Sequence, residues 1–268
     1  MPAKSHIFIG VGGWTYEPWR GSFYPADLPQ KRELEYMSRA LTSIEINGTY
    51  YGSQKPESFI KWREETPDGF VFSVKGPRFA TNRRVLADSA ESVERFFSSG
   101  VLELKEKLGP VNWQFMATKK FDVEDFAKFL ALLPKESGGR KIRHAVEVRH
   151  ASFATAEFVA LAREHGVAII TAGDSEFPQI ADVTADFVYV RIMGTQEKPK
   201  AGYAGKALDQ WADRAGTWAE GGVPADLRSL AAPVAKAPRD VFLYVISGFK
   251  ENNPRAAEAL IERVGKML

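Results

Sequence analysis

Short runs rich in β-branched and aromatic residues alternate along the chain with longer segments that carry apolar residues every three or four positions. Successive side chains of a strand point to opposite faces, whereas a helix repeats every 3.6 residues, so the two patterns can be distinguished. The strand pattern occupies residues 7–12, 43–47, 70–75, 111–115, 144–149, 167–171, 187–192 and 241–246. The helical pattern occupies residues 31–41, 56–65, 89–108, 122–133, 155–165, 206–220 and 253–268.

Eight strand runs that alternate with helical runs predict a parallel sheet closed into one (β/α)8 barrel of the TIM type. No linker rich in Pro, Ser or Gly divides the chain, so we expect a single domain over residues 1–268. Only the connection 172–186 lacks a helical pattern. Residues 221–240 contain three prolines and predict a loop excursion with a helical turn before the last strand, in preference to a functional lid.

Polar side chains follow one face of several predicted strands. In 144–149, Val146 and Val148 share one face, while Glu147 and Arg149 share the other. Because helices cover the outside of a barrel, the apolar face should point outward and the ionic face inward. The same alternation places inward the side chains of Glu45, Asn47, Ser73, Lys75, Gln114, Glu147, Arg149, Tyr189 and Arg191.

Converging charges at the C-terminal ends of barrel strands predict an active site there. Glu147 is the candidate general acid or base, and Glu45 or Asp174 is its carboxylate partner. The candidate substrate-binding residues are Trp14, Tyr16, Trp19, Arg20, Asn47, Lys75, Arg78, Gln114, Arg149, His150, Tyr189 and Arg191. A structural ion-pair layer is the alternative, although buried ion pairs cost several kcal/mol of desolvation per ion and are a poor source of stability.

The loop after the first strand, residues 14–25, is rich in aromatic residues. Trp14, Tyr16 and Trp19 offer flat faces on which a sugar ring or a base could stack, and Arg20 would lie near a phosphate or carboxylate. The alternative is that the loop packs across the barrel mouth and fixes its neighbours. The two roles can coexist.

Cofactor sites are not indicated by the sequence. Of the four histidines, only His150 is expected at the mouth, so a multinuclear zinc cluster cannot form. We therefore predict that the protein binds no metal. The weaker alternative is a single Mg²⁺ held by carboxylates. The glycines of 10–13 lack the G-x-G-x-x-G spacing of a dinucleotide site. Our leading hypothesis is therefore a metal-independent enzyme that acts on a small anionic or sugar-like substrate by carboxylate acid–base chemistry.

Composition adds few limits on location and partners. The chain has no cysteine, which is compatible with a reducing compartment, and no run approaches the ~18 apolar residues of a membrane span. We expect a cytoplasmic protein with no membrane contact; the oligomeric state is not indicated. A net charge of +2 does not by itself imply a polyanion. Nucleic-acid binding is nevertheless an alternative function, with a phosphate track made of Lys75, Arg78, Arg83, Arg84, Lys198 and Lys200.

Several motifs in fixed order also resemble a known family. They are 9-IGVGGWTYEPWRGSFYP-25, 44-IEINGTYY-51, 65-ETPDGFVFSVKGPR-78, 107-KLGPVNWQF-115, 146-VEVRHASF-153 and 187-FVYVRIMG-194. Together they resemble the YecE-like family, a domain of unknown function also called DUF72. The resemblance implies a TIM-like barrel, similar to the sugar-isomerase and apurinic-endonuclease barrels, with no established reaction.

The sequence departs from that family pattern near the expected mouth. Asn82 and Met193 stand where such proteins often carry histidine, 116-MAT-118 replaces a diproline, and 246-ISG-248 replaces an aromatic residue followed by two asparagines. These departures indicate a divergent member. They motivate a third hypothesis, a binding protein without catalytic activity.

Overall fold

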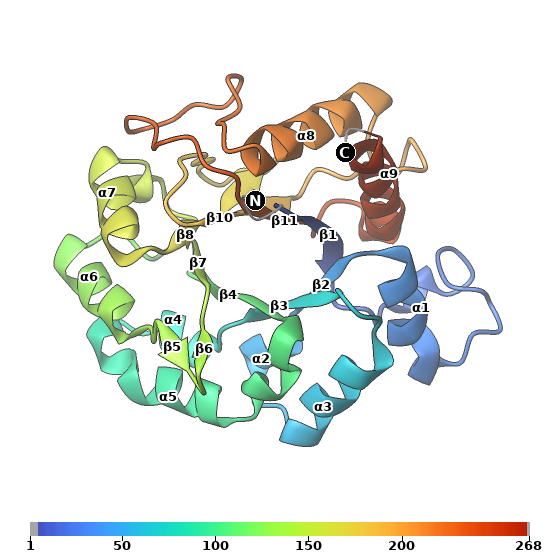
Figure 1. Ribbon diagram of the computed structural model, residues 1–268, viewed down its shortest axis with the longest axis horizontal. Helices are drawn as coiled ribbons and strands as arrows, with labels where there is room; N and C mark the ends of the chain where they lie inside the picture. Colours follow the sequence, from blue (N-terminus) through green and yellow to red (C-terminus); the bar gives the residue numbers. More distant parts are fainter. Residues whose placement is uncertain (1–4, 267–268) are drawn as a thin grey trace.

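The ring of the barrel is closed by a strand that is divided in two. The structure, a computed structural model, describes residues 5–266. Its main sheet is parallel throughout, in the order β8-β7-β4-β3-β2-β1-β11-β10-β9. Only Ile170 separates β8 (Ala168–Ile169), which pairs with β7, from β9 (Thr171–Gly173), which pairs with β10. The two segments therefore serve as one strand, and the predicted (β/α)8 barrel is confirmed (Figure 1).

The remaining strands lie where the alternation places them. They are β1 (Ile7–Gly12), β2 (Ser43–Ile46), β3 (Val71–Lys75), β4 (Leu108–Gln114), β7 (His144–Glu147), β10 (Phe187–Ile192) and β11 (Asp240–Val245). A small antiparallel hairpin, β5 (Glu136–Ser137) and β6 (Arg140–Lys141), precedes β7. The first and last strands of the barrel pair along their length, from Ile7 with Val241 to Val11 with Val245.

The longer helices surround the strands (Figure 1). They are α1 (Glu33–Ala40), α3 (Pro56–Glu65), α5 (Ala90–Ser98), α6 (Val123–Leu132), α7 (Ala156–His165), α8 (Gly205–Ala219) and α9 (Asn253–Gly265). Side-chain caps begin two of them: Asp122 accepts from the Asp125 N–H, and Thr155 accepts from the Phe158 N–H. Two one-turn helices, α2 (Gly48–Tyr51) and α4 (Arg78–Thr81), follow β2 and β3 on the mouth side. The last predicted helix extends to residue 268, but residues 267 and 268 lie outside the part of the chain that the structure describes.

The helix predicted over 89–108 is wrong in its second half. Helix α5 ends at Ser98, and Gly100 has a φ of +104°, which residues with a Cβ rarely adopt. A 3-10 segment, Val101–Lys107, follows and contains a second left-handed residue, Lys105. The amphipathic pattern continues through this break because Val101 and Leu104 are still buried.

The two irregular connections are held by specific side chains. No helix occurs between β9 and β10, where the sequence has no clear helical pattern, in a segment that the structure describes throughout. In the excursion at 221–240, the Asp182 carboxylate accepts from the N–H groups of Leu230 and Ala231, and Arg239 donates to the Gly221 carbonyl at 2.9 Å. One hydrogen-bonded turn, Pro224 to Leu227, interrupts an otherwise irregular path. The excursion is therefore a loop fixed at several points.

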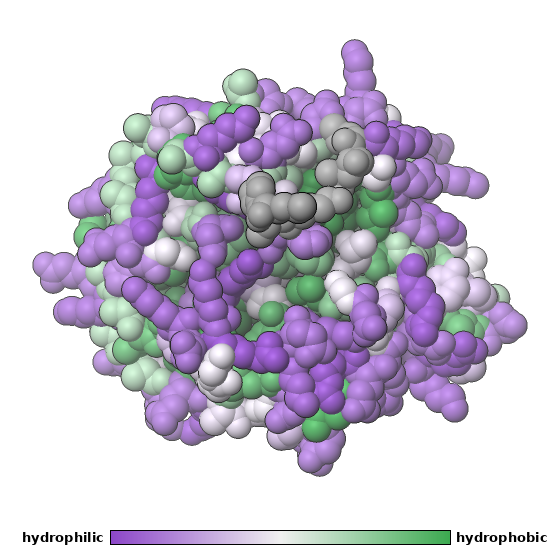
Figure 2. Space-filling view, in the orientation of Figure 1, coloured by the Kyte–Doolittle hydropathy of each residue, from purple (hydrophilic) through white to green (hydrophobic). Residues whose placement is uncertain are grey.

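Apolar side chains form two separate layers. The larger lies between the strands and the helices and includes Val146 and Val148, as the alternation predicts. The smaller fills the barrel interior with Phe187, Tyr189, Phe242 and Tyr244 among others. Hydrophilic residues prevail on the face of the molecule that Figure 2 shows, with hydrophobic residues between them. No helix within residues 5–266 has the length and apolar character needed to cross a membrane.

Candidate functional site

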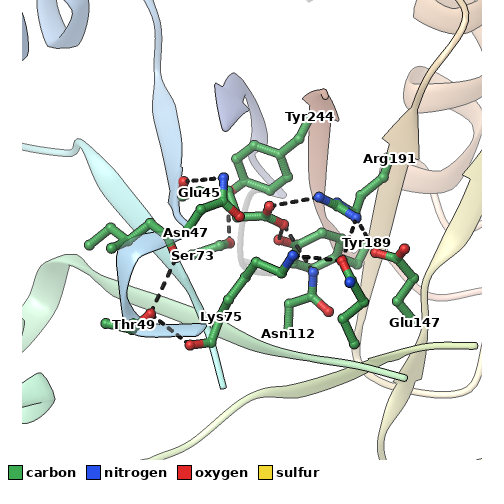
Figure 3. Close-up of polar contacts among 12 residues, drawn as sticks. Glu45, Asn47, Thr49, Ser73, Lys75, Asn112, Glu147, Tyr189, Arg191 and Tyr244 are labelled. Carbon is green, nitrogen blue, oxygen red and sulfur yellow. Dashed lines mark hydrogen bonds and ion pairs between the residues drawn. The ribbon is translucent and has the colours of Figure 1, made fainter. Parts of the chain in front are cut away.

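The polar centre of the barrel is organised around the guanidinium of Arg191, on β10, which is only 2% exposed. Its Nη2 donates to Glu45 Oε1 at 3.0 Å, and its Nη1 donates to Glu147 Oε2. Both carboxylates are fully buried. Because β1 and β11 separate β2 from β10 in the sheet, the Arg191–Glu45 bond crosses the barrel interior (Figure 3). The three side chains thus meet in one place, as the strand alternation predicts.

Neutral groups complete the hydrogen bonding of Glu45. Its Oε2 accepts from the Tyr189 hydroxyl at 2.5 Å and from Asn112 Nδ2 at 3.0 Å. Burial, together with the Glu45 charge, raises the pKa of Tyr189 well above its usual value, so its hydroxyl remains a donor at neutral pH. Asn112 was not among the predicted residues, although it lies two positions before Gln114 on the same strand and the same alternation would have placed it inward.

A second polar group lies beside the first. The Tyr244 hydroxyl, on β11, is 2.6 Å from Ser73 Oγ (Figure 3). It is also 2.7 Å from Ser43 Oγ, and all three residues are buried. Ser43 also donates to the Val71 carbonyl. The tyrosine therefore joins β11 to β2 and β3 across the barrel. Tyr244 too was missed, because its strand reads as apolar throughout.

Glu147 is surrounded by positive charge. Arg149 Nε and Nη2 both approach its Oε1, at 2.7 and 2.6 Å, while Arg191 occupies Oε2. Burial alone would raise the pKa of Glu147, but Arg191, Arg149 and Lys75 together hold it below its ordinary value. This carboxyl is therefore ionised at neutral pH. A carboxylate in this state is a poor proton donor and, with both oxygens occupied, a weak base.

Lys75 lies at the end of β3, nearer to solvent than the carboxylates, at 7% exposed. Its Nζ donates to Gln114 Oε1 at 2.6 Å and stands 4.7 Å from the centre of the Tyr50 ring, on α2. Burial, and after it the charge of Arg191, lowers the pKa of Lys75 to about 8. Thr49 fixes the strand end by donating to the Lys75 carbonyl at 2.7 Å.

Asp174, Asn47 and His150 are less directly part of this network. Asp174 is exposed, has a φ of +53°, and accepts from Trp211 Nε1 at 2.8 Å. Asn47 is half-buried and lies 3.5 Å from the Glu45 carbonyl. His150 Nδ1 accepts from the Ser152 N–H and caps the turn after β7. None of the three has a hydrogen bond to Arg191 or to a Glu45 or Glu147 carboxylate among the described residues.

The aromatic loop after β1 is largely packed. Trp19 is fully buried and donates from Nε1 to the Lys250 carbonyl, so the prediction that it stacks on a ligand is wrong. Trp14 is half-buried and packs edge-on against Trp62 at 5.1 Å. Tyr16 carries Lys250 Nζ over its ring at 4.0 Å. Arg20 donates to the buried Glu33, at 2.7 Å. These contacts favour the alternative in which the loop fixes its neighbours.

Exposed aromatic and basic residues occur beside the mouth. The guanidinium of Arg78 lies 5.8 Å from the Tyr51 ring and 5.5 Å from the Phe79 ring. The two rings are 66% and 59% exposed. A pocket of about 290 Å³ lies next to them, between α2, α4 and α5, with Arg83 on its wall and Thr49 as its link to the Lys75 strand end.

Residues 5–266 hold no group of three or more His, Cys, Asp or Glu side chains that could bind a metal ion.

The chain is similar to proteins of one family. A family model described as protein of unknown function DUF72 matches residues 8–267. The UPF0759 protein YecE of Escherichia coli (strain K12) is 29% identical over 148 residues, which is 55% of this chain and 50% of that protein. The UPF0759 protein YunF of Bacillus subtilis (strain 168) is 28% identical over 114 residues, covering 41% and 39%. The match thus spans about half the length of YecE, and less of YunF.

Solved structures show the same fold over nearly the whole chain. A DUF72 family protein from Thermotoga maritima MSB8 superposes with a TM-score of 0.72 at 21% identity, covering 98% of both chains. A second DUF72 family protein, from Enterococcus faecalis V583, superposes with a TM-score of 0.69 at 16% identity, and the superposition covers 98% of this chain and 95% of that one. The TM-score is 0.51, at 16% identity, with a xylose isomerase-like TIM barrel/4-hydroxyphenylpyruvate dioxygenase fusion protein. This superposition covers 99% of this chain but 44% of the fusion protein.

Proposed function

The chain belongs to the DUF72 family of proteins of unknown function, and we propose that it is an enzyme that binds a small anionic or sugar-like substrate at the C-terminal mouth of its barrel. One observation carries the proposal. The network holds three cations, Lys75, Arg149 and Arg191. Against them stand two carboxylates, Glu45 and Glu147, both fully buried. One positive charge is in excess, and the two cations nearest to solvent are Lys75 and Arg149, which suits a negatively charged ligand.

The surroundings of the carboxylates support a role different from the one that the sequence suggests. Glu45 and Glu147 orient Arg191 and keep it ionised, whereas exchanging protons would require one of them to release a guanidinium. Gln114 and Asn47 supply amide groups near the mouth that suit hydroxyls. Lys75, with a pKa of about 8, is the group best able to gain and lose a proton near neutral pH.

A thermal-shift screen with acetate, phosphate, sugar acids and sugar phosphates tests the proposal. A ligand that binds only the folded state stabilises it by RT ln(1 + [L]/Kd), about 2.7 kcal/mol at one hundred times Kd. We expect at least one anion to raise the melting temperature. Lys75→Met should weaken that anion about tenfold or more, since a hydrogen bond to a charged group contributes about 1.5–3 kcal/mol.

Lys31→Met is the matched control, because Lys31 is an exposed lysine before α1. It should leave the shift unchanged. An equal loss in both variants, or no shift with any anion, would count against the proposal.

Binding of single-stranded nucleic acid is the second candidate function, favoured by the exposed Tyr51, Arg78 and Phe79. Stacking of a base on such a ring contributes about 1–3 kcal/mol to the binding free energy. If this function is correct, a fluorescent oligonucleotide should bind at low salt, lose affinity steeply between about 50 and 200 mM salt, and bind less tightly to Phe79→Ala. Absence of any anisotropy change at low salt would remove this candidate.

A further inference from the structure

Lys75 differs from the other two cations of the network in what it contacts. Arg191 and Arg149 are each paired with carboxylates. Within residues 5–266, Lys75 Nζ has no carboxylate oxygen within 4.0 Å, and its hydrogen bond goes to the neutral amide of Gln114. Its Nζ also lies over the Tyr50 ring, 4.7 Å from the ring centre. The contacts of Lys75 therefore hold an amine in place without requiring it to be charged.

The groups that face Lys75 from neighbouring elements oppose one another. Burial and Arg191, from β10, lower its pKa, and Arg149, beyond the end of β7, acts in the same direction more weakly. Glu45 and Glu147 act in the opposite direction, but each is already paired with a guanidinium. At a pH equal to the Lys75 pKa of about 8, half of the protein molecules carry this lysine as a neutral, nucleophilic amine. Desolvation beside another cation is a known way to activate a lysine.

Lys107 provides an internal comparison. Its residue exposure to solvent is similar, at 6%, and burial also lowers its pKa. Its Nζ, however, donates to three oxygens: the carbonyls of Arg63 and Thr66 and the Thr66 hydroxyl. Three acceptors use all three protons of an ammonium. Lys107 is thus positioned to remain charged at a helix end, whereas Lys75 has one acceptor within the part of the chain that the structure describes.

We propose that Lys75 is a covalent nucleophile that forms a Schiff base with a small aldehyde or ketone bearing a carboxylate or phosphate. The inference rests on the proposed function, because the carbonyl compound would occupy the same mouth, with its anionic group toward Arg149. The neutral amine attacks the carbonyl carbon, and a proton moves from nitrogen to oxygen to give a carbinolamine. The hydroxyl then takes up a proton and leaves as water, which yields a protonated imine; addition of water reverses the step.

Reductive trapping with glyoxylate and cyanoborohydride tests the inference. The hydride donor reduces the imine to a stable secondary amine, so each event adds one carboxymethyl group, which intact-mass analysis detects and peptide mapping locates. Near neutral pH, Lys75 should be modified at least about tenfold faster than an average exposed lysine, because its pKa is lower than the ordinary value near 10.4. The rate should rise as the pH approaches 8 and level off above it.

Two variants make the outcome decisive. Lys75→Arg keeps a cation but lacks the amine, and should lose the fast modification while still unfolding cooperatively. Lys107→Met should retain the fast modification of Lys75. Adducts on exposed lysines alone, in folded wild-type protein, overturn the inference. If an anion still shifts the melting temperature in a Lys75-dependent manner in that case, the proposed binding function stands without the Schiff base. A fast adduct on Lys75 without any anion shift would instead support the nucleophile and contradict the anionic substrate class.

Discussion

Replacing Arg191 with methionine should lower the free energy of unfolding by about 3–5 kcal/mol, the usual cost of removing one partner from a buried ion pair. Methionine fills much of the arginine volume, so the loss reports charge more than packing. The substitution leaves the carboxylates of Glu45 and Glu147 buried, and Glu45 loses its ionic partner. Urea denaturation at neutral pH measures the change. Arg39→Met is the control, because the contacts of Arg39 with Glu35, a 3.7 Å ion pair and a 2.6 Å hydrogen bond to the carbonyl, are exposed, and at most about 1 kcal/mol is expected for such a pair.

The loss of stability in this variant should depend on pH. In the wild type, the lowered pKa of Glu147 gives stability that is present above its unfolded pKa and lost as the pH falls through the folded one. Without Arg191, the burial of Glu147 is opposed only by Arg149 and Lys75, so its pKa should be higher than in the wild type. A raised pKa gives stability that is present at low pH and lost as the pH rises, so the deficit should shrink toward pH 5. If the free energy of unfolding of the Arg191→Met variant were less than about 1 kcal/mol below that of the wild type, or if this difference did not change with pH, the account of the network would be contradicted.

Gly10→Ala should be comparably damaging for a steric reason. A Cβ at this position of β1 would lie 1.9 Å from the Ser43 carbonyl oxygen and 2.6 Å from the Ser43 carbonyl carbon. Overpacking usually costs 1–3 kcal/mol, and since backbone atoms cannot rotate away we expect about 3 kcal/mol or more. The melting temperature and the soluble yield measure it. Moving Ser43 would also disturb its hydrogen bond to Tyr244, next to the Arg191 network.

Gly13→Ala is the comparison for Gly10→Ala. Gly13 has a φ of +73°, but a methyl group added there would have no atom of residues 5–266 within 4 Å beyond its chain neighbours. Only backbone strain of about 1–2 kcal/mol is therefore expected. If the two variants were equally stable, the close approach of β1 to β2 would not be what requires Gly10.

The fold could be predicted because strand alternation depends on a single physical requirement. Val146 and Val148 must be covered by helices, and this alone directs Glu147 into the barrel. The same rule brought Glu45, Lys75 and Arg191 together from strands far apart in sequence. It did not depend on any knowledge of the reaction.

The rest could not be predicted because loops and turns have no such period. Trp19 and Trp14 look equivalent in the sequence, yet one is fully buried and the other half-buried. Asp174 follows a strand as a catalytic residue would, but its carboxylate binds Trp211. The proton affinity of Glu147 depends on Arg149, two residues further along, and on Arg191 and Lys75 from other strands, and a sequence pattern does not give the distances to them.

The distribution of the network along the chain has a consequence for assembly. The β5–β6 hairpin, with Gly138 and Gly139 at its turn, separates Glu45 and Lys75 from Glu147 and Arg191. A chain cut at this hairpin would give two half-barrels, each with part of the network. The first would bury Glu45 without its guanidinium, and the second would carry two arginines for one carboxylate. The Glu45–Arg191 ion pair can form only when the two halves meet, so the network favours docking of complementary fragments over pairing of like halves.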